Sequence, residues 1–176
     1  ARITPSEELN EHAEDLIASM LTAGLDADAL SWGTVVAQGS PAWGLLALAQ
    51  PDRPSPVSED QVDSYYGNDE SANYRKSAFF VAGLAGLGRI ESDVQAEYDE
   101  YLELGFGRQT RWSELISQAA DVNNPALVAF LAAAGMQGES WDQMTPRHLF
   151  HIVSALSKVG MTAEARMIAA EAVARS

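Results

Sequence analysis

The feature that most constrains the fold of this chain is a repeated signal for starting and stopping helices. Four times, a polar residue that can cap a helix stands directly before a proline, at Thr4, Ser40, Asn124 and Thr145. The cap accepts a hydrogen bond from a free backbone amide, and proline suits the first turn because no partner is needed there for its missing N–H. Glycines follow the apolar segments, where a left-handed residue ends a helix at little steric cost. The pattern predicts many short helices.

This punctuation predicts an all-α fold of about ten helices. No segment alternates apolar and polar residues in the period of two that a strand requires, so we expect no sheet. We expect the helices to form antiparallel α-hairpins, arranged either as a two-layer, solenoid-like stack or as a compact bundle. The predicted helices span residues 5–22, 27–38, 41–49, 58–66, 72–87, 92–104, 111–121, 125–134, 146–159 and 163–175.

The domain organisation depends on one proline-rich connection. Residues 50–58 contain three prolines, which favour a stiff, extended segment and form a possible boundary. Fifty residues make a poor core alone, so we expect a single domain over residues 1–176. The chain begins with Ala1 rather than Met, and we interpret it as the C-terminal part of a longer protein. The nine arginines against two lysines are typical of a GC-rich bacterial genome.

A corner motif recurs in the sequence and carries a resemblance to a repeat family. Residues 16–30 (LIASMLTAGLDADAL) and 152–166 (IVSALSKVGMTAEAR) share an apolar helix, a glycine, an apolar residue and a polar cap, and residues 81–94 are a looser copy. The last hairpin, GMTAEARMIAAEAVA at residues 160–174, resembles a tetratricopeptide-type unit. The resemblance covers about 30 residues and implies a stack of helical hairpins without catalysis of its own.

Few residues offer catalytic or metal chemistry. The chain has no cysteine, and its sequence contains no nucleophile-elbow or phosphate-loop motif. His148 and His151 lie three residues apart on one predicted helix, yet the spacing supplies no further ligands, so we expect neither a metal nor a cofactor. We place His148 at the edge of the core and His151 on the outside. The glycine-rich stretch at 83–88 predicts a small-residue face for close helix packing rather than a phosphate cradle.

Charge is the most informative functional signal. The net charge is −14, and all of it falls in residues 1–105, which carry 19 acidic and 5 basic residues, whereas residues 106–176 are neutral. Such a field repels nucleic acid and anionic membranes. Asp93, Glu97 and Glu100 recur on one face of a predicted helix, either as a solvated outer face or as a docking face for a protein with a basic surface.

Aromatic residues supply the remaining candidates for binding. Tyr98 and Tyr101 belong to a cluster of tyrosines in the central third of the chain, and Trp141 falls in a predicted loop, where it either anchors a ligand or packs over a helix end. His148 and His151 complete the set of candidate binding residues. By contrast, we expect Phe130 to be deeply buried, because its helix lies in a twelve-residue stretch without charge.

These observations favour a non-catalytic helical scaffold or protein-interaction domain of a bacterial protein. Two alternatives remain: an accessory or regulatory domain of an enzyme, and a small-ligand binder or enzyme that uses a cleft lined with tyrosine and tryptophan. The longest apolar stretches suit buried helices rather than membrane spans. The sequence does not distinguish the cytoplasm from the periplasm, and it leaves the oligomeric state open.

Overall fold

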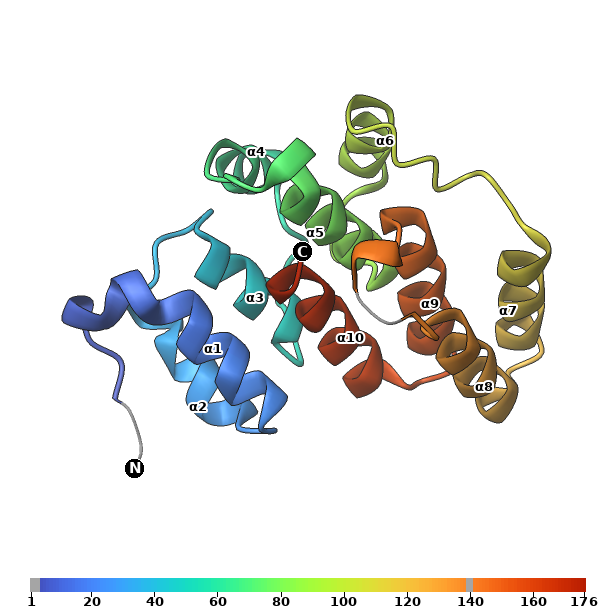
Figure 1. Ribbon diagram of the computed structural model, residues 1–176, viewed down its shortest axis with the longest axis horizontal. Coiled ribbons are helices and arrows are strands. Elements are labelled where there is room, and N and C mark those ends of the chain that lie inside the picture. Colours follow the sequence, from blue (N-terminus) through green and yellow to red (C-terminus); the bar gives the residue numbers. More distant parts are fainter. Residues whose placement is uncertain (1–3, 139–140) are drawn as a thin grey trace.

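The computed structural model describes residues 4–138 and 141–176 and is all-helical. The helices run in the order predicted from the helix start and stop signals of the sequence, with short 3₁₀ segments between some of them (Figure 1). The α-helices among the described residues are α1 (Ala13–Thr22), α2 (Asp26–Leu30), α3 (Pro41–Ala49), α4 (Glu59–Gly67), α5 (Arg75–Gly86), α6 (Ser92–Tyr101), α7 (Arg111–Asp121), α8 (Pro125–Gly135), α9 (Pro146–Lys158) and α10 (Thr162–Ala174).

Three of the four predicted proline caps form as expected. The side chains of Ser40, Asn124 and Thr145 each accept a hydrogen bond from the backbone amide three residues on, at 3.1, 3.1 and 3.2 Å. The fourth cap was predicted wrongly: Thr4 lies before the first helical turn, which is a 3₁₀ segment that starts at Glu7. Proline therefore marks the start of α3, α8 and α9 correctly.

The recurring corner motif is one hydrogen-bonded helix end used repeatedly. Gly24, Gly88 and Gly160 all have a positive φ. The amide of the next residue bonds the carbonyl five residues back at 2.8, 2.8 and 2.9 Å, the arrangement of a Schellman cap. The following apolar residue does not always close the core, since Leu25 is 48% exposed. The sequence repeat therefore reflects a shared way of ending α1, α5 and α9.

The helices form a compact arrangement rather than an extended stack. In a solenoid each repeat touches only its neighbours. Here α10, the last helix, lies in the middle of the molecule and contacts α1 and α3 from the start of the chain as well as α5 and α9 (Figure 1). The α7–α8 hairpin lies at the end of the molecule opposite α1 and α2. Of the two arrangements left open by the sequence, the structure shows the compact one.

The glycine-rich end of α5 allows close helix packing in the core, as predicted. A Cβ atom at Gly83 would lie 2.9 Å from Leu48 of α3 and 3.1 Å from Ala169 of α10. A Cβ atom at Gly86 would lie 2.8 Å from Val153 of α9. Cβ atoms essentially never lie within 3.0 Å of such neighbours, so a larger residue at Gly86 would displace α9, and one at Gly83 would require Leu48 and Ala169 to shift.

Two arginines fix the C-terminal end of α3. Arg166 is 8% exposed and donates to the carbonyl of Ala49. Arg89 donates to the carbonyls of Ala47 and Leu48 at 2.8 and 2.9 Å, and to Gln50 at 2.5 Å. Burial and the nearby charges of Arg166 and Arg53 lower the pKa of Arg89 to about 10, so it stays protonated at neutral pH. Both cations suit the negative end of the helix dipole.

The proline-rich connection, residues 50–58, is held by Arg89. The backbone amide of Val57 donates to the carbonyl of Arg89 at 2.7 Å, and Val57 itself is fully buried. This contact forms an isolated parallel bridge between Val57 and Ile90. Near its C-terminal end, this connection is thus attached through Val57 to the segment between α5 and α6. At its N-terminal end, the carbonyl of Gln50 accepts a hydrogen bond from the Arg89 side chain.

Several helices are shorter than predicted. The segment predicted as a helix over 72–87 starts with a 3₁₀ turn at 72–74, in which Asn73 and Tyr74 are left-handed with φ of 57° and 53°, and α5 begins only at Arg75. The helix predicted over 27–38 ends as α2 at Leu30 and continues as a 3₁₀ turn. Propensity alone does not reveal such breaks, because tertiary contacts decide them.

The prediction that Phe130 is deeply buried was wrong. Its side chain is 69% exposed, and only Val128 and Ala132 of α8 are buried. Helix α8 packs on α7 and α9 with one narrow face, and the rest of its uncharged surface faces outward. An uncharged sequence therefore does not identify a helix surrounded on all sides, because exposed alanines satisfy the same pattern.

Truncation of two phenylalanines tests this layering. We expect Phe130→Ala to change the free energy of unfolding by less than about 0.5 kcal/mol, because the side chain leaves no cavity. Phe79→Ala, at a fully buried position of α5, should cost about 3–5 kcal/mol. Urea denaturation of both variants measures the difference, and comparable losses would contradict the position of α8 at the surface.

Replacement of Arg166 tests the cap on α3. Arg166→Met should lower the free energy of unfolding by about 1.5–3 kcal/mol, because a buried carbonyl loses a charged donor. Arg175→Met is the matched control: its side chain is 58% exposed and pairs with Glu171 on the surface, so we expect a loss of at most about 0.5 kcal/mol. Equal losses in the two variants would argue against a special role for Arg166.

Candidate functional site

Three tyrosines from separate elements form a stacked cluster on the surface. The rings of Tyr66 and Tyr74 are stacked with centroids 4.4 Å apart, and Tyr101 of α6 meets Tyr66 edge-on at 5.5 Å. The Tyr101 hydroxyl donates to the Tyr66 hydroxyl at 3.3 Å. Tyr74 is 45% exposed and Tyr101 is 62% exposed, so aromatic surface is presented to solvent in a fixed arrangement.

Strained backbone holds one member of this cluster. Asn73 and Tyr74 are consecutive left-handed residues, and the left-handed region is rare for a bulky residue such as tyrosine. This conformation places the Tyr74 ring on Tyr66 of the preceding helix. A strained conformation costs about 1–3 kcal/mol per residue, and such strain gathers at functional sites.

Tyr98 is buried next to the cluster and is not available to a binding partner. It is only 4% exposed, and its hydroxyl donates to the carboxylate of Asp63 in α4. Burial and this carboxylate raise the pKa of Tyr98, which therefore keeps its proton. Its ring meets Tyr101 edge-on at 6.3 Å. The sequence grouped Tyr98 with the candidate binding residues, whereas the structure makes it the link between α4 and α6.

Carboxylates lie on the two helices that supply Tyr66 and Tyr101. Asp93, Glu97 and Glu100 are all exposed on α6, as predicted, and Glu97 lies one turn before Tyr101. Asp63 lies one turn before Tyr66 on α4. We define the tyrosine–carboxylate face by Tyr66, Tyr74, Tyr101, Asp63 and the three carboxylates of α6.

The basic residues nearest to this face in the sequence are bonded elsewhere. Arg75 donates to the carbonyls of Trp141 and Met144 at 2.6 and 3.3 Å and lies over the Phe79 ring. Lys76 is paired with Glu14 of α1 at 2.5 Å. The tyrosine–carboxylate face therefore keeps its negative charge.

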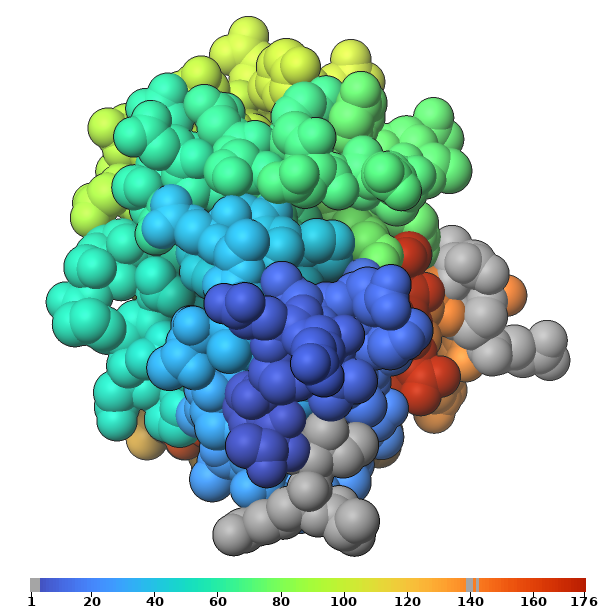
Figure 2. Space-filling view, turned by 90° about the vertical axis from the view of Figure 1, so that its left-hand side faces the viewer, coloured from blue at the N-terminus to red at the C-terminus, as the bar shows by residue number. Residues whose placement is uncertain are grey.

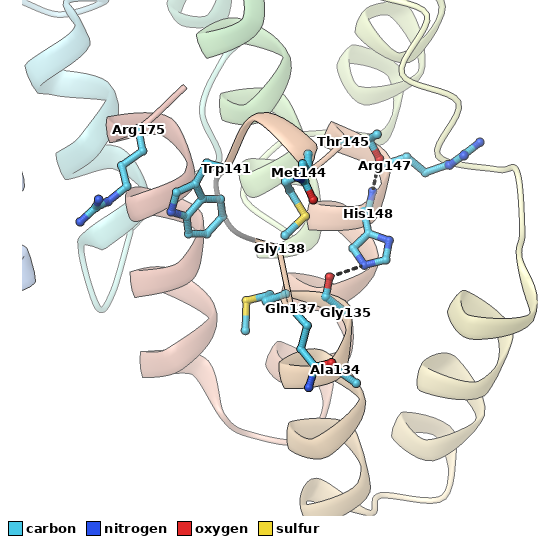
Figure 3. A pocket seen from close by; sticks show the side chains of 12 residues that line it. Ala134, Gly135, Gln137, Gly138, Trp141, Met144, Thr145, Arg147, His148 and Arg175 are labelled. Atoms are coloured by element: carbon cyan, nitrogen blue, oxygen red, sulfur yellow. Dashed lines mark hydrogen bonds between the residues drawn. The ribbon is translucent and has the colours of Figure 1, made fainter.

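His148 has a packing role. Its ring stacks on Trp112 with centroids 3.8 Å apart, and its Nε2 lies 3.1 Å from the carbonyl oxygen of Gly135, to which the neutral ring can donate (Figure 3). A Cβ atom at Gly135 would lie 2.6 Å from Trp112 and 2.7 Å from His148, so only glycine fits there. Burial lowers the pKa of His148.

His151 differs from its predicted outward position. Its side chain is half-buried, with its ring 5.3 Å from that of Phe150 and its Nε2 atom buried. Burial lowers its pKa, and a hydrogen bond with the backbone of Arg108 opposes that shift. His151 thus lies toward the packed side of α9, because the apolar face of this helix is wide.

Trp141 borders a cleft of about 930 Å³ between the end of α8 and the start of α9. The tryptophan is half-buried and packs against the core, and its carbonyl receives Arg75. Figure 3 shows the Arg147 and Arg175 side chains pointing away from the space between Trp141 and His148. The polar groups do not converge, so this cleft lacks the arrangement expected of a catalytic site.

The α7–α8 hairpin carries a second exposed surface, which is apolar. Leu115, Val122, Leu127 and Phe130 are 54%, 74%, 43% and 69% exposed. Apolar patches of a few hundred Å² on a surface often mark interaction sites. The hairpin lies in the part of the sequence without net charge.

Two further searches of the described residues concern metals and membranes. No group of three or more histidine, aspartate or glutamate side chains among them is placed to hold a metal ion. None of the described helices has the length and apolar character needed to cross a bilayer.

Comparisons with known proteins give no family for the chain. No protein-family model, no curated protein and no solved structure matches it. The resemblance of the last hairpin to tetratricopeptide units therefore stays a prediction from the sequence.

Sequence reasoning did not single out three members of the site. Tyr66 and Tyr74 were noticed only as part of a tyrosine cluster, and Asp63 was not singled out. Asn73 was the available signal, because asparagine is enriched in left-handed conformations and here precedes the stacked tyrosine. Contacts between α4 and α6 are not encoded by any spacing along the chain.

The two buried histidines predict how stability depends on pH. Burial lowers the pKa of both His148 and His151, so the folded state binds fewer protons than the unfolded state just below pH 6.5. Their contribution is fully present above about pH 6.5 and is lost as the pH falls through the lower folded-state pKa. We expect a lower melting temperature at about pH 5.5 than at about pH 7.5.

The histidine variants provide the measurement. The His148→Gln/His151→Gln double variant should show a shallower pH dependence of the melting temperature than the wild type. His12→Gln is the control, because the His12 side chain is 62% exposed, and its curve should follow the wild type. Parallel curves for all three proteins would show that other groups set the dependence.

Proposed function

We propose that the chain is a non-catalytic protein-interaction domain that docks a basic segment of a partner on the tyrosine–carboxylate face. The observation that carries the proposal is the stack of Tyr66, Tyr74 and Tyr101, which exposes aromatic surface next to helices that carry exposed carboxylates. Tyrosine and tryptophan are enriched where proteins recognise one another.

The chemistry of this face favours a cationic ligand. Arginine and lysine are attracted to the faces of aromatic rings, and the attraction strengthens when carboxylates lie nearby. Asp63 and Glu97 each precede a tyrosine of the cluster by about one turn. An arginine side chain of a partner can therefore stack on a ring and pair with a carboxylate at once.

The overall charge distribution supports the same partner. The excess of acidic residues lies in residues 1–105, which include α4 and α6. A negative surface attracts a basic partner over a distance of about one Debye length and raises the association rate. The exposed apolar surface of α7 and α8 also suits an interaction domain. An accessory domain of an enzyme would dock through the same face.

An oligocationic peptide tests the proposal without knowledge of the natural partner. Octa-arginine and octa-lysine, labelled with a fluorophore, should bind the wild type with an affinity that falls as salt rises. The Tyr74→Ala/Tyr101→Ala variant should lose about fivefold or more in affinity, with a larger loss for octa-arginine because guanidinium stacks on rings. Phe130→Ala removes an exposed aromatic ring outside the face and should bind as the wild type does.

A pair of triple variants separates the face from net charge. Replacement of Asp93, Glu97 and Glu100 by the corresponding amides should weaken binding by about threefold to tenfold at low salt. Replacement of Glu7, Glu8 and Glu11 by Gln changes the net charge equally, on an exposed 3₁₀ segment in front of α1. Equal weakening in the two triple variants would contradict a specific docking face. Neither variant should lose stability, because the carboxylates are exposed.

A further inference from the structure

A second site is indicated by a buried tyrosine that is separate from the exposed cluster. Tyr65 is 2% exposed, and its ring stacks on Phe80 with centroids 4.1 Å apart. On the other side, a Cβ atom at Gly44 would lie 2.3 Å from the Tyr65 ring, so α3 packs directly against it. The ring cannot turn away, and the position of its hydroxyl is fixed.

The hydroxyl of Tyr65 is buried and has no hydrogen-bond partner among the described residues. A buried polar group without a partner is costly, and most such groups in native proteins are satisfied. Tyr65 lines a pocket of about 600 Å³ formed by segments that are far apart in the sequence. Its polar lining includes Glu14, Asn68, Asp69 and Lys76, and we call it the Tyr65 pocket.

The segments that form the Tyr65 pocket meet on one face of the molecule. In Figure 2 the blue α1, the green region around the start of α5 and the red end of the chain lie side by side on that face. The position of the pocket thus depends on α10 and α1 being brought against α5.

The pocket holds a carboxylate that is oriented by neutral donors. Asp69 accepts hydrogen bonds from the Ser71 amide at 2.8 Å, the Ser77 amide at 2.7 Å and the Ser77 hydroxyl at 2.6 Å. These bonds fix the carboxylate without neutralising its charge. Burial, followed by the charges of Asp69 and Glu14, raises the pKa of Tyr65, so the phenol keeps its proton.

Lys76 marks the kind of group that this environment stabilises. Its ammonium group lies in the pocket lining and contacts Glu14 at 2.5 Å. Glu14, Asp69 and Glu70 all line the pocket, and Lys76 balances one of these charges. A further cation is therefore favoured over an anion or a neutral group.

We propose that the Tyr65 pocket binds a primary ammonium group, which donates to the Tyr65 hydroxyl oxygen and takes Asp69 as its counter-charge. The ligand is either a small free amine or a lysine side chain of a peptide. The proposal does not depend on the tyrosine–carboxylate face, because it uses different side chains and a buried hydroxyl rather than exposed rings.

Two amines distinguish the sources in a titration followed by nuclear magnetic resonance. Putrescine represents a free amine and Nα-acetyl-lysine methylamide represents a peptide side chain, while 1-butanol is an uncharged probe of similar length. We expect saturable shifts of the backbone amides of residues 37–40, 68–71 and 76 with at least one amine, and none with 1-butanol. The amine that binds more tightly assigns the source. No saturable shift with either amine would overturn the proposal.

Tyr65→Phe is the decisive variant, because it removes only the buried hydroxyl. We expect it to weaken amine binding about tenfold or more. Without ligand it should melt about 2–4 °C higher than the wild type, because an unpaired buried polar group is removed. Phe130→Ala is the control, because Phe130 lies outside both the Tyr65 pocket and the tyrosine–carboxylate face, and it should keep the wild-type affinity for the amine. Unchanged amine affinity in Tyr65→Phe, or a lower melting temperature, would show that the hydroxyl has a structural role and would contradict the proposal.

Lys76→Gln provides a test in the opposite direction. Because the lysine contributes a like charge to the pocket, its removal should raise the affinity for the amine about threefold or more. The Lys76→Gln/Tyr65→Phe double variant should not show this gain in amine affinity, because it lacks the Tyr65 hydroxyl. A loss of amine affinity in Lys76→Gln alone would contradict the assigned charge balance.

Discussion

The close packing along α5 is the contact on which the rest of this structure depends. Gly83 and Gly86 let α3, α9 and α10 approach to distances that no side chain at these positions would permit. Because α10 then reaches the middle of the molecule, the end of the chain packs on its beginning, through α1 and α3. The short helices are held by these distant contacts, since isolated helices of this length are marginal in water. Both proposed sites lie on elements that follow from this arrangement, with α4 and α6 both in contact with α5.

The distribution of the few basic residues links composition to function. Arg89 and Arg166 bind the carbonyls at the end of α3, Arg75 binds the carbonyls around Trp141, and Lys76 binds Glu14. These cations satisfy backbone carbonyls or join distant helices, so they are not positioned over the carboxylates of α6. The exposed surface is negative because these basic side chains are used inside the fold as hydrogen-bond donors to backbone carbonyls and as links between helices. These four cations are therefore engaged within the molecule.

The sequence predicted the start and end of most helices but not which of their faces are buried. Caps such as Ser40 and corners such as Gly160 depend on residues next to one another in the chain, so their signals are local. The exposure of Phe130 and the inward turn of His151 depend on which helices happen to be neighbours, and an uncharged or mixed pattern permits either outcome. For the site, the sequence identified the acidic face of α6 and Tyr101. It did not identify the stacking of Tyr66 on Tyr74, because the left-handed pair at residues 73 and 74 interrupts the expected helix.

Several costly features of this structure fall in one short stretch of the chain, although others among the described residues, such as the unpartnered buried Nε1 of Trp32 and the left-handed Glu103, lie elsewhere. Between Tyr65 and Lys76 lie a buried hydroxyl without a partner, two consecutive left-handed residues without glycine, and a carboxylate held only by neutral donors. The buried hydroxyl and the left-handed pair each lower stability on their own, and each has a simple substitute, such as phenylalanine at position 65 or glycine at position 74. Selection for stability alone would favour these substitutes, whereas residues at functional sites commonly depart from the local preferences that stabilise a fold. Under the two proposals, the strain at Tyr74 serves the exposed aromatic stack and the buried hydroxyl serves a ligand of the Tyr65 pocket. Both proposals therefore assign a binding role to the connection between α4 and α5 and the residues that flank it.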